Sequence, residues 1–363
     1  MEKIDFVIIG AGVVGMQTAL TLINNGVAPE DIAIFEQNPF PGEHSSSRNS
    51  GVLHAGLYYP QNSLKQKLCL DGNRMWRTQA SELGIEIKKI GKYVVATNIQ
   101  EIEELNELYN FSIKKSVPEI SWVGTEEIDC LKEVINVEKA FLSKNTGIID
   151  CAEMIKKLSE YLYKKGVNFL ENQKVDLIYE NKKLKIKCNK ETFRANTVIN
   201  TAGLYAVDLR KSIGLEDIEN NYVKGNYLKL NKKYFNDYLI YPLPEKSLKG
   251  LGIHTVVQGD GSVLFGPNTE DVFDVNYQMN SKIIAEIYYG ISKIFKNINI
   301  EDLSLAYSGI RSKIIKDNKL YSDFLIQSPV ENYIEALGID SPGLTASPAI
   351  ASYICSIAMR SST

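Results

Sequence analysis

The pattern of apolar and polar residues at the start of the chain predicts a strand, a helix and a second strand. Residues 4–9 (IDFVII) form a short apolar run, typical of a buried strand, that ends at a glycine. Over residues 13–26, apolar side chains return about every 3.6 residues, which predicts a helix that ends at Asn25-Gly26. Residues 32–36 (IAIFE) form a second strand that ends in an acidic residue. Together they predict a βαβ unit.

The rest of the chain alternates between helical and strand patterns, without an internal repeat or a low-complexity linker. Residues 222–270 alternate tyrosine, leucine and valine with turn signals, which predicts an antiparallel sheet. Because no linker is found, we expect a second domain inserted into the first rather than appended to it. Helices are predicted over 64–83, 100–110, 151–165, 281–295 and at the end of the chain, and strands over 92–97, 167–170, 174–188 and 197–203.

A glycine-rich turn joins the first predicted strand to the first helix. Gly10, Gly12 and Gly15 have the spacing G-x-G-x-x-G. Gly10 permits a tight turn, Gly12 lets the backbone approach a pyrophosphate, and Gly15 allows close packing of helix on strand. The helix N-terminus offers free N–H groups to the anion. Glu36, at the end of the second strand, is placed to accept hydrogen bonds from ribose hydroxyls. The pattern predicts a dinucleotide site and serves FAD and NAD equally.

Composition narrows the class of protein. With 363 residues, of which 44% are apolar and 23% charged, the chain can form about two domains. A net charge of −3 without a basic stripe argues against a nucleic-acid partner. The five cysteines are scattered and lack a CxxC pair, so we expect neither a metal site nor a disulfide framework, which fits a reducing cytoplasm. We expect no signal peptide and no transmembrane segment, since no apolar run approaches about 18 residues.

Residues 45–60 (SSSRNSGVLHAGLYYP) carry the most specific signal: small polar residues, then a histidine, then an aromatic pair. This segment resembles the FAD-dependent oxidoreductases of the D-amino-acid oxidase and glycerol-3-phosphate dehydrogenase superfamily. Within that superfamily it is most similar to the L-2-hydroxyglutarate oxidase and dehydrogenase group. Further matching pieces follow in family order: IIGAGVVGMQTAL, NTAGLYAVDLR, KGNYLKL, SGIRSKI and SPGLTASPAI.

The resemblance implies a mixed fold, α/β and α+β, in which a Rossmann-type FAD-binding domain carries an inserted antiparallel-sheet substrate domain. The FAD-binding domain is expected to be discontinuous and to consist of residues 1–84, 143–220 and 305–363. The substrate-binding domain is expected to consist of residues 85–142 and 221–304.

The resemblance also implies a non-covalent FAD. Oriented N–H groups at the start of the last helix would stabilise the negative charge of reduced flavin. Cys355, in that helix, is expected to be a buried core residue rather than a point of flavin attachment. The expected cofactor-binding residues are Gly10, Gly12, Val13, Val14, Gly15, Glu36, Gln37, Ser47, Asn49, Ser50, Gly51, His54, Val175, Ala202, Gly203, Gly309, Gly343, Leu344 and Thr345.

Oxidation of a 2-hydroxy acid needs a base for the hydroxyl proton and a clamp for the carboxylate. His54 is predicted to be the base or an orienting group, because an ordinary histidine pKa suits proton transfer at neutral pH. A histidine that only packs on the flavin is the alternative. Arg311 is predicted to be the catalytic clamp, because a guanidinium presents a planar fork to a carboxylate. A surface or interdomain salt bridge is the alternative.

Further side chains are candidates for the substrate site. Tyr58 and Tyr241 are predicted substrate contacts, although each could be an ordinary core tyrosine. For His254, substrate contact and a structural hydrogen bond are equally plausible. His44 is expected beside the phosphate region, and Lys67 on a solvated helix face.

The favoured function is FAD-dependent oxidation of a small 2-hydroxy acid by hydride transfer to flavin N5, with L-2-hydroxyglutarate, converted to 2-oxoglutarate, as the first candidate. One alternative is an amine or amino-acid oxidase acting on glycine, sarcosine or D-amino acids. Another is a glycerol-3-phosphate dehydrogenase-like enzyme, although no additional cations cluster near Arg311 in the sequence. A non-catalytic flavin-binding module is the last.

The expected partners are a small carboxylate substrate and an electron acceptor, which is oxygen, a quinone or a carrier protein. The expected location is the cytoplasm, with peripheral contact at the inner face of the membrane left open.

Overall fold

A six-stranded, mainly parallel sheet forms one half of the computed structural model, which describes residues 4–181, 183–234, 238–244 and 252–360. Its strands are β1 (Ile4–Ile9), β2 (Ile32–Phe35), β9 (Asn168–Leu170), β13 (Ala195–Asn200), β21 (Leu325–Val330) and β22 (Tyr333–Leu337). They follow the order β21-β22-β13-β1-β2-β9, and β1 lies between the parallel strands β2 and β13. β21 is antiparallel to β22. The predicted Rossmann-type fold is thereby confirmed.

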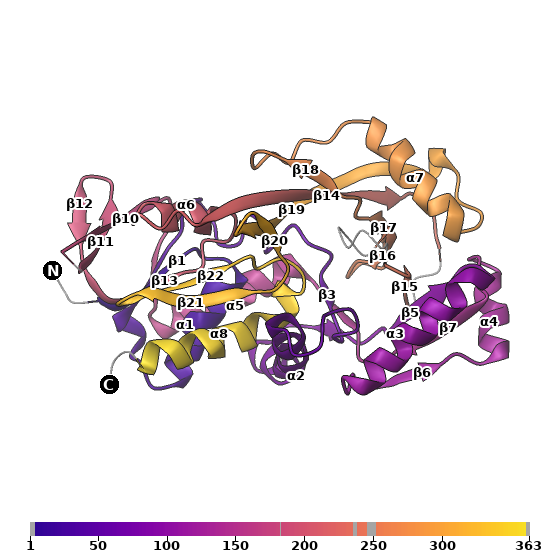
Figure 1. The fold of residues 1–363 in the computed structure, drawn as a ribbon, viewed down its shortest axis with the longest axis horizontal. Helices are drawn as coiled ribbons and strands as arrows, with labels where there is room; N and C mark the ends of the chain where they lie inside the picture. Colours follow the sequence, from indigo (N-terminus) through magenta and orange to yellow (C-terminus); the bar gives the residue numbers. More distant parts are fainter. Residues whose placement is uncertain (1–3, 182, 235–237, 245–251, 361–363) are drawn as a thin grey trace.

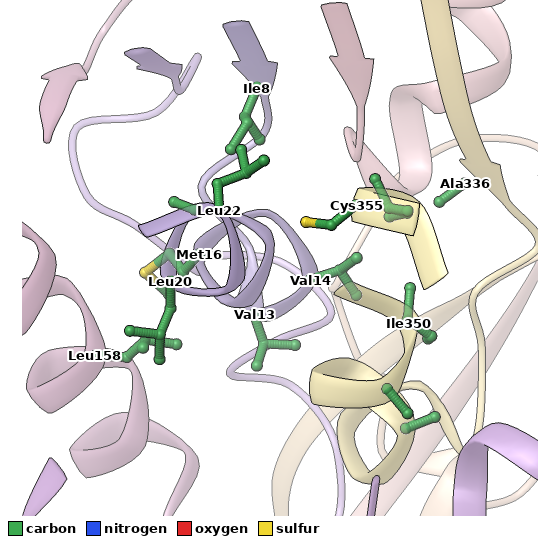
Figure 2. Packing of buried hydrophobic residues seen from close by; sticks show 14 of the residues in the cluster. Ile8, Val13, Val14, Met16, Leu20, Leu22, Leu158, Ala336, Ile350 and Cys355 are labelled. Atoms are coloured by element: carbon green, nitrogen blue, oxygen red, sulfur yellow. The ribbon is translucent and has the colours of Figure 1, made fainter. Parts of the chain in front are cut away.

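Alternating side chains of this sheet enter two apolar layers, as expected for a sheet that is buried on both faces. Ile8 packs into one core with four helices, whereas Val7 and Ile9 pack into the core on the opposite face. Figure 2 shows the first core, where Leu20 of α1 points toward Leu158 of α5. The first face is covered by α1 (Val13–Asn24), α2 (Leu64–Leu83), α5 (Cys151–Lys165) and α8 (Gly343–Arg360), and the second by α6 (Ala206–Lys211) and the small sheet of β10 (Val175–Glu180), β11 (Lys183–Cys188) and β12 (Glu191–Phe193).

Two long strands, β14 (Ile218–Leu230) and β19 (Leu303–Lys316), extend from the parallel sheet toward the other half of the molecule (Figure 1). They pair antiparallel along most of their length, with Gly225 opposite Gly309. Each strand crosses one of the expected domain boundaries, so the division of the chain into two domains stays a prediction. Their sheet is completed by β16 (His254–Val257), β17 (Val263–Gly266), β18 (Glu270–Val272) and β20 (Lys319–Tyr321).

A four-stranded sheet lies in the other half, in the order β15-β5-β7-β6. β15 pairs parallel with β5, so the prediction of one antiparallel sheet over 222–270 is wrong for this segment. An alternating apolar pattern shows that a segment is a strand but does not specify its neighbour. Residues 235–237 and 245–251 of that range lie outside the described residues. The elements are β5 (Lys92–Ala96), β6 (Ile120–Trp122), β7 (Lys139–Ser143), β15 (Leu239–Pro242), α3 (Ile102–Lys114), α4 (Thr125–Lys132) and α7 (Lys282–Ile294).

The remaining elements are short. A three-stranded sheet of β3 (Val52–Leu53), β8 (Gly147–Ile149) and β4 (Ile87–Lys88) connects the two halves, and the 3-10 turns are η1 (Pro29–Asp31), η2 (Ile99–Glu101), η3 (Gly203–Tyr205) and η4 (Ile300–Asp302). The sequence did not predict α4, β21 or β22, and the helix expected over 100–110 begins at Ile102 and continues to Lys114. In the described part of the chain, no helix is both long and apolar enough to cross a membrane.

Candidate active site

A cavity of about 870 Å³ opens at the carboxyl ends of β1, β2 and β13. Its walls come from the turn after β1, the loop after β2, the start of η3, strand β19 and the start of α8. In open α/β sheets, ligands bind at this edge because the loops of parallel strands diverge there. The volume lies within the range of about 300–1,000 Å³ that is usual for ligand pockets.

The turn between β1 and α1 depends on glycine. Gly10 has a positive φ of 101°, and a Cβ atom there would lie 2.6 Å from the carbonyl oxygen of Thr201. A Cβ atom on Gly15 would lie 2.1 Å from the carbonyl oxygen of Gly10. Since both contacts are with backbone, a side chain at either glycine would require the segment after β13 or α1 to move. Gly12, Val13 and Val14 line the cavity, so the N-terminus of α1 faces it and is available to an anion.

Glu36 lies at the tip of β2 beside this turn. Its Oε2 atom accepts a hydrogen bond from the backbone N–H of Ala11 at 3.0 Å, and its Oε1 atom accepts one from Asn38 at 2.9 Å. Burial raises the pKa of Glu36, although these two hydrogen bonds lower it in part. The carboxylate is therefore held in a fixed position at the cavity wall, where the sequence predicts a ribose contact.

The loop after β2 is held against α1 by serine and asparagine side chains. Ser46 Oγ accepts a hydrogen bond from the backbone N–H of Val13 at 2.9 Å, and Asn49 Nδ2 donates to the carbonyl oxygens of Ser45 and Ser46. Ser47, the predicted contact, is exposed and does not line the cavity. A run of three serines does not indicate which one faces the cavity, so Ser46 was not among the cofactor contacts predicted from sequence.

His54 is fixed to the start of α8. Its backbone N–H donates to Thr345 Oγ1 at 2.9 Å, and its Nε2 atom lies 3.4 Å from Ser341 Oγ. Trp76 of α2 donates to the carbonyl oxygen of Leu344. These contacts join the predicted base and the predicted flavin-facing helix N-terminus in one rigid unit.

Six residues of the cavity wall each carry a buried polar atom that has no hydrogen-bond partner among the described residues. The atoms are His44 Nε2, His54 Nδ1, Tyr58 Oη, Tyr59 Oη, Tyr241 Oη and Arg311 Nη1. Buried polar groups in folded proteins are almost always paired, so this cluster calls for polar partners that the described residues do not supply. The ring of His254 stacks on that of Tyr241 with a centroid separation of 3.8 Å and lines the same cavity.

Burial controls the protonation of this part of the cavity. It lowers the pKa of His54 well below the usual value, and nearby Lys92 and His254 lower it further. Burial likewise lowers the pKa of His254 to about 3. Burial raises the pKa of Tyr58 and of Tyr241 far above 10. At neutral pH both imidazoles are therefore neutral and both phenols keep their protons.

A buried ion-pair cluster that the sequence did not predict lies beside these residues. Asp340 pairs with Lys65 at 2.5 Å and with Lys313 at 3.0 Å, and all three residues line the cavity. Burial alone would raise the pKa of Asp340, but the two lysines together outweigh it and lower the pKa. Lys313 follows Arg311 by two positions on β19, so the statement that no further cation clusters near Arg311 is wrong. Lys67, by contrast, is exposed as expected.

The Asp340 cluster gives a stability prediction. Asp340→Asn should lower the free energy of unfolding by about 3–5 kcal/mol, because it leaves the buried ammonium group of Lys65 and the partly buried one of Lys313 without their counter-charge. Urea unfolding at neutral pH measures this loss. Asp71→Asn is the matched control, because the Asp71–Arg74 pair is exposed and should contribute about 0–1 kcal/mol. Equal, small losses in both variants would contradict the assigned role of Asp340.

Most of the predicted site residues line this one cavity. Gly15 and Gly51 do not: Gly15 acts in helix packing, and a Cβ atom on Gly51 would lie 2.5 Å from the carbonyl oxygen of Ile149. His44 lines the cavity, and its Nδ1 atom lies 2.7 Å from Tyr277 Oη. The predicted residues found in the wall are Gly10, Gly12, Val13, Val14, Glu36, Gln37, Asn49, Ser50, His54, Tyr58, Val175, Ala202, Gly203, Tyr241, His254, Gly309, Arg311, Gly343, Leu344 and Thr345.

Comparison with known proteins identifies related chains. The family model described as "FAD dependent oxidoreductase" (DAO) matches residues 5–357. The mitochondrial L-2-hydroxyglutarate dehydrogenase of Arabidopsis thaliana is 32% identical over 99% of this chain and 84% of its own length. The glycerol 3-phosphate dehydrogenase of Caloramator mitchellensis is 31% identical over 97% of this chain and 73% of its own length.

A solved structure shares the fold. The dithionite-reduced L-α-glycerophosphate oxidase of Mycoplasma pneumoniae, with FAD bound, superimposes with a TM-score of 0.88 at 24% identity. The match covers 99% of this chain and 95% of that one.

The geometry of the cavity fits FAD. Gly10 and Gly12 line the cavity, α1 presents its N-terminus there, and Glu36 lies at the strand tip beside them. Cys355 is buried in the core between α8 and α1 and does not line the cavity. The residues that would hold the dinucleotide are therefore Gly10, Gly12, Glu36 and the loop around Ser46 and Asn49, while Gly15 allows α1 to pack on the turn.

Proposed function

Because this chain belongs to the family of FAD-dependent oxidoreductases, we propose that it oxidises a small 2-hydroxy acid, with L-2-hydroxyglutarate as the first candidate substrate. The single observation that carries the proposal is the set of six unpaired polar atoms in residues of the cavity wall. They include a neutral imidazole and a guanidinium, which are the groups that a hydroxyl and a carboxylate require. The name of the Arabidopsis relative supports the choice of substrate.

His54 serves in the proposed reaction as the base for the substrate hydroxyl. Its Nε2 atom lies 3.4 Å from Ser341 Oγ, whereas Nδ1 has no partner. In the tautomer in which Nε2 donates to Ser341 Oγ, Nδ1 carries the lone pair that accepts the substrate's proton. Bound FAD supplies the hydride acceptor. Transfer of the hydroxyl proton to Nδ1 would leave an alkoxide oxygen, which forms the C=O double bond as the Cα–H bond breaks and its hydride passes to the acceptor. Burial keeps the imidazole neutral, which is the form that can accept the proton.

Arg311 serves as the carboxylate clamp. It lies on β19 opposite β14, and a Cβ atom on Gly225 would lie only 3.2 Å from both terminal nitrogens of its guanidinium. Among the described residues, no carboxylate forms an ion pair with Arg311, and its Nη1 atom is buried and unpaired. The salt-bridge alternative for Arg311 is therefore not supported. Tyr58 and Tyr241 can donate to the same substrate carboxylate as Arg311.

Arg311→Lys gives a test of the clamp. Lysine keeps the charge but loses the planar fork, so the apparent substrate constant should rise about 10- to 100-fold while the limiting rate of flavin reduction changes less. Stopped-flow reduction over a range of substrate concentrations separates the two parameters. Arg74→Lys, at an exposed arginine, is the matched control. An unaltered substrate constant would refute the clamp.

A second candidate is oxidation of sn-glycerol 3-phosphate. Lys65 and Lys313 line the same cavity as Arg311 and could receive a phosphate group, and the Caloramator relative bears that name. Amine oxidation, acting on glycine, sarcosine or D-amino acids, is the third candidate function.

Side-by-side assay of these substrates and of 2-hydroxy acids, with an artificial dye as electron acceptor, tests the proposal. Turnover restricted to glycerol 3-phosphate or to amines would overturn it. Oxygen, a quinone or a carrier protein is proposed as the natural acceptor.

A further inference from the structure

Lys92 occupies an unusual position for a lysine. It begins β5, and only 1% of its surface is exposed. Its Nζ atom lies 4.6 Å from the ring centroid of Tyr58 and 4.6 Å from that of Tyr241. Both tyrosines line the cavity, whereas Lys92 itself does not. The ammonium group therefore lies behind the wall that the two aromatic rings form.

No counter-charge accompanies this ammonium group. Among the described residues no carboxylate pairs with it, and the one group that favours its charge electrostatically is the Cys69 thiol. Burial raises the pKa of Cys69 to about 12, so this thiol is neutral near pH 7. Two ring faces stabilise a cation only weakly compared with an ion pair, so a buried charge remains that is not neutralised.

We propose that Lys92 is a positioning residue of the substrate site, whose buried charge is neutralised by the anionic group of the bound substrate on the other side of Tyr58 and Tyr241. This inference deepens the proposed function, because it concerns the charge of that substrate. The field of a buried cation acts over several ångströms, since little water screens it. Arg311, with its unpaired Nη1 atom, adds to the same positive potential.

The proposal implies that anion binding and protonation of Lys92 are linked. Burial lowers the pKa of Lys92 to about 7, so the free site loses this charge as the pH rises above 7. An anion favours the charged form and must therefore raise that pKa. Binding should take up a proton above pH 7, and the affinity should fall as the pH rises, by at most tenfold per pH unit.

Other titratable groups that face Lys92 or its neighbours do not produce this dependence. His54 and His254 stay neutral, Tyr58, Tyr241 and Cys69 stay protonated, and Arg311 stays charged. Lys115 is the exception, because burial lowers its pKa to about 8. Its Nζ atom, however, donates to the carbonyl oxygens of Leu57 and Tyr59, on the loop that carries Tyr58. A Lys92 variant separates the two lysines.

The test uses the FAD-loaded protein and ligands that cannot be oxidised. Calorimetry with glutarate, and separately with inorganic sulfate, which stays a dianion throughout and stands in for a phosphate group, is carried out from pH 6 to pH 9 in buffers of different ionisation enthalpy. The wild type should take up close to one proton per bound anion above pH 7. Lys92→Met, similar in length and uncharged, should bind about tenfold more weakly at pH 6 and take up none. Lys92→Arg should bind without pH dependence. Lys67→Met, at an exposed lysine, should match the wild type.

The outcomes distinguish this inference from the proposed function. Binding of glutarate, or of sulfate, with uptake of a proton supports the role of Lys92. The ligand that binds indicates whether the substrate carries a second carboxylate or a phosphate group. If anion binding takes up a proton but no 2-hydroxy acid is oxidised, the role of Lys92 is supported and the proposed substrate is wrong. Anion binding with the same pH dependence in Lys92→Met, or with none in the wild type, would overturn the role of Lys92. Absence of anion binding at every pH would overturn it as well.

Discussion

His54→Gln should slow reduction of the bound flavin by the hydroxy-acid substrate about 10²- to 10⁴-fold, the usual contribution of a positioned general base. Glutamine fills a similar space but cannot accept the hydroxyl proton. The cofactor should remain bound, because His54 contacts the start of α8 through its backbone N–H, which donates to Thr345 Oγ1. Stopped-flow absorbance under anaerobic conditions measures the reduction rate at saturating substrate.

The control for His54→Gln is the FAD content of the same preparation. Equal FAD content with a slower reduction separates loss of the base from loss of the fold. A reduction rate within threefold of the wild type, roughly 0.7 kcal/mol, would show that His54 is not the base. His54 would then be a structural residue that packs on the flavin.

Gly15→Ala should reduce the amount of FAD retained on purification roughly tenfold or more, since the added Cβ atom would meet the carbonyl oxygen of Gly10 at 2.1 Å. Both atoms belong to a buried helix–strand contact, so relief requires α1 to move away from β1. Overpacking of this kind costs about 1–3 kcal/mol and also displaces the helix N-terminus from the anion site. Flavin absorbance relative to protein absorbance gives the retained fraction.

Gly124→Ala is the matched control for Gly15→Ala. Gly124 precedes α4, and an added Cβ atom would meet nothing within 4 Å. Its FAD content should equal that of the wild type. Full FAD content in both variants would contradict the packing role assigned to Gly15.

For the proposed nucleotide half of the site, the sequence predicts most of the residues that line the cavity, because this half is local in the chain. Gly10, Gly12 and Glu36 belong to one βαβ unit, in which strand, turn and helix follow each other within a short stretch of chain. Each residue type there has a fixed backbone task, so the residue pattern implies the geometry. The choice between adjacent serines was the exception, because backbone conformation decides which of Ser46 and Ser47 turns inward.

The substrate half depends on contacts between segments far apart in sequence. Lys65, Lys313 and Asp340 come from α2, β19 and the loop before α8, and they meet only in the folded chain. From sequence, Lys65 in α2 would be predicted to be solvated, as Lys67 two positions later is. Lys92 reads in sequence as the polar start of a strand. The pairing of β15 with β5 places it behind Tyr241, and no local pattern indicates that pairing.

Anaerobic addition of L-2-hydroxyglutarate to the FAD-loaded protein, followed by the visible absorbance of oxidised flavin, tests the central proposal most directly. We expect the L-enantiomer to bleach the flavin and the D-enantiomer not to, because the base, the clamp and the bound flavin that accepts the hydride fix three points around Cα, and only one enantiomer satisfies all three. Bleaching by an amine or by glycerol 3-phosphate, with no response to either enantiomer, would contradict it.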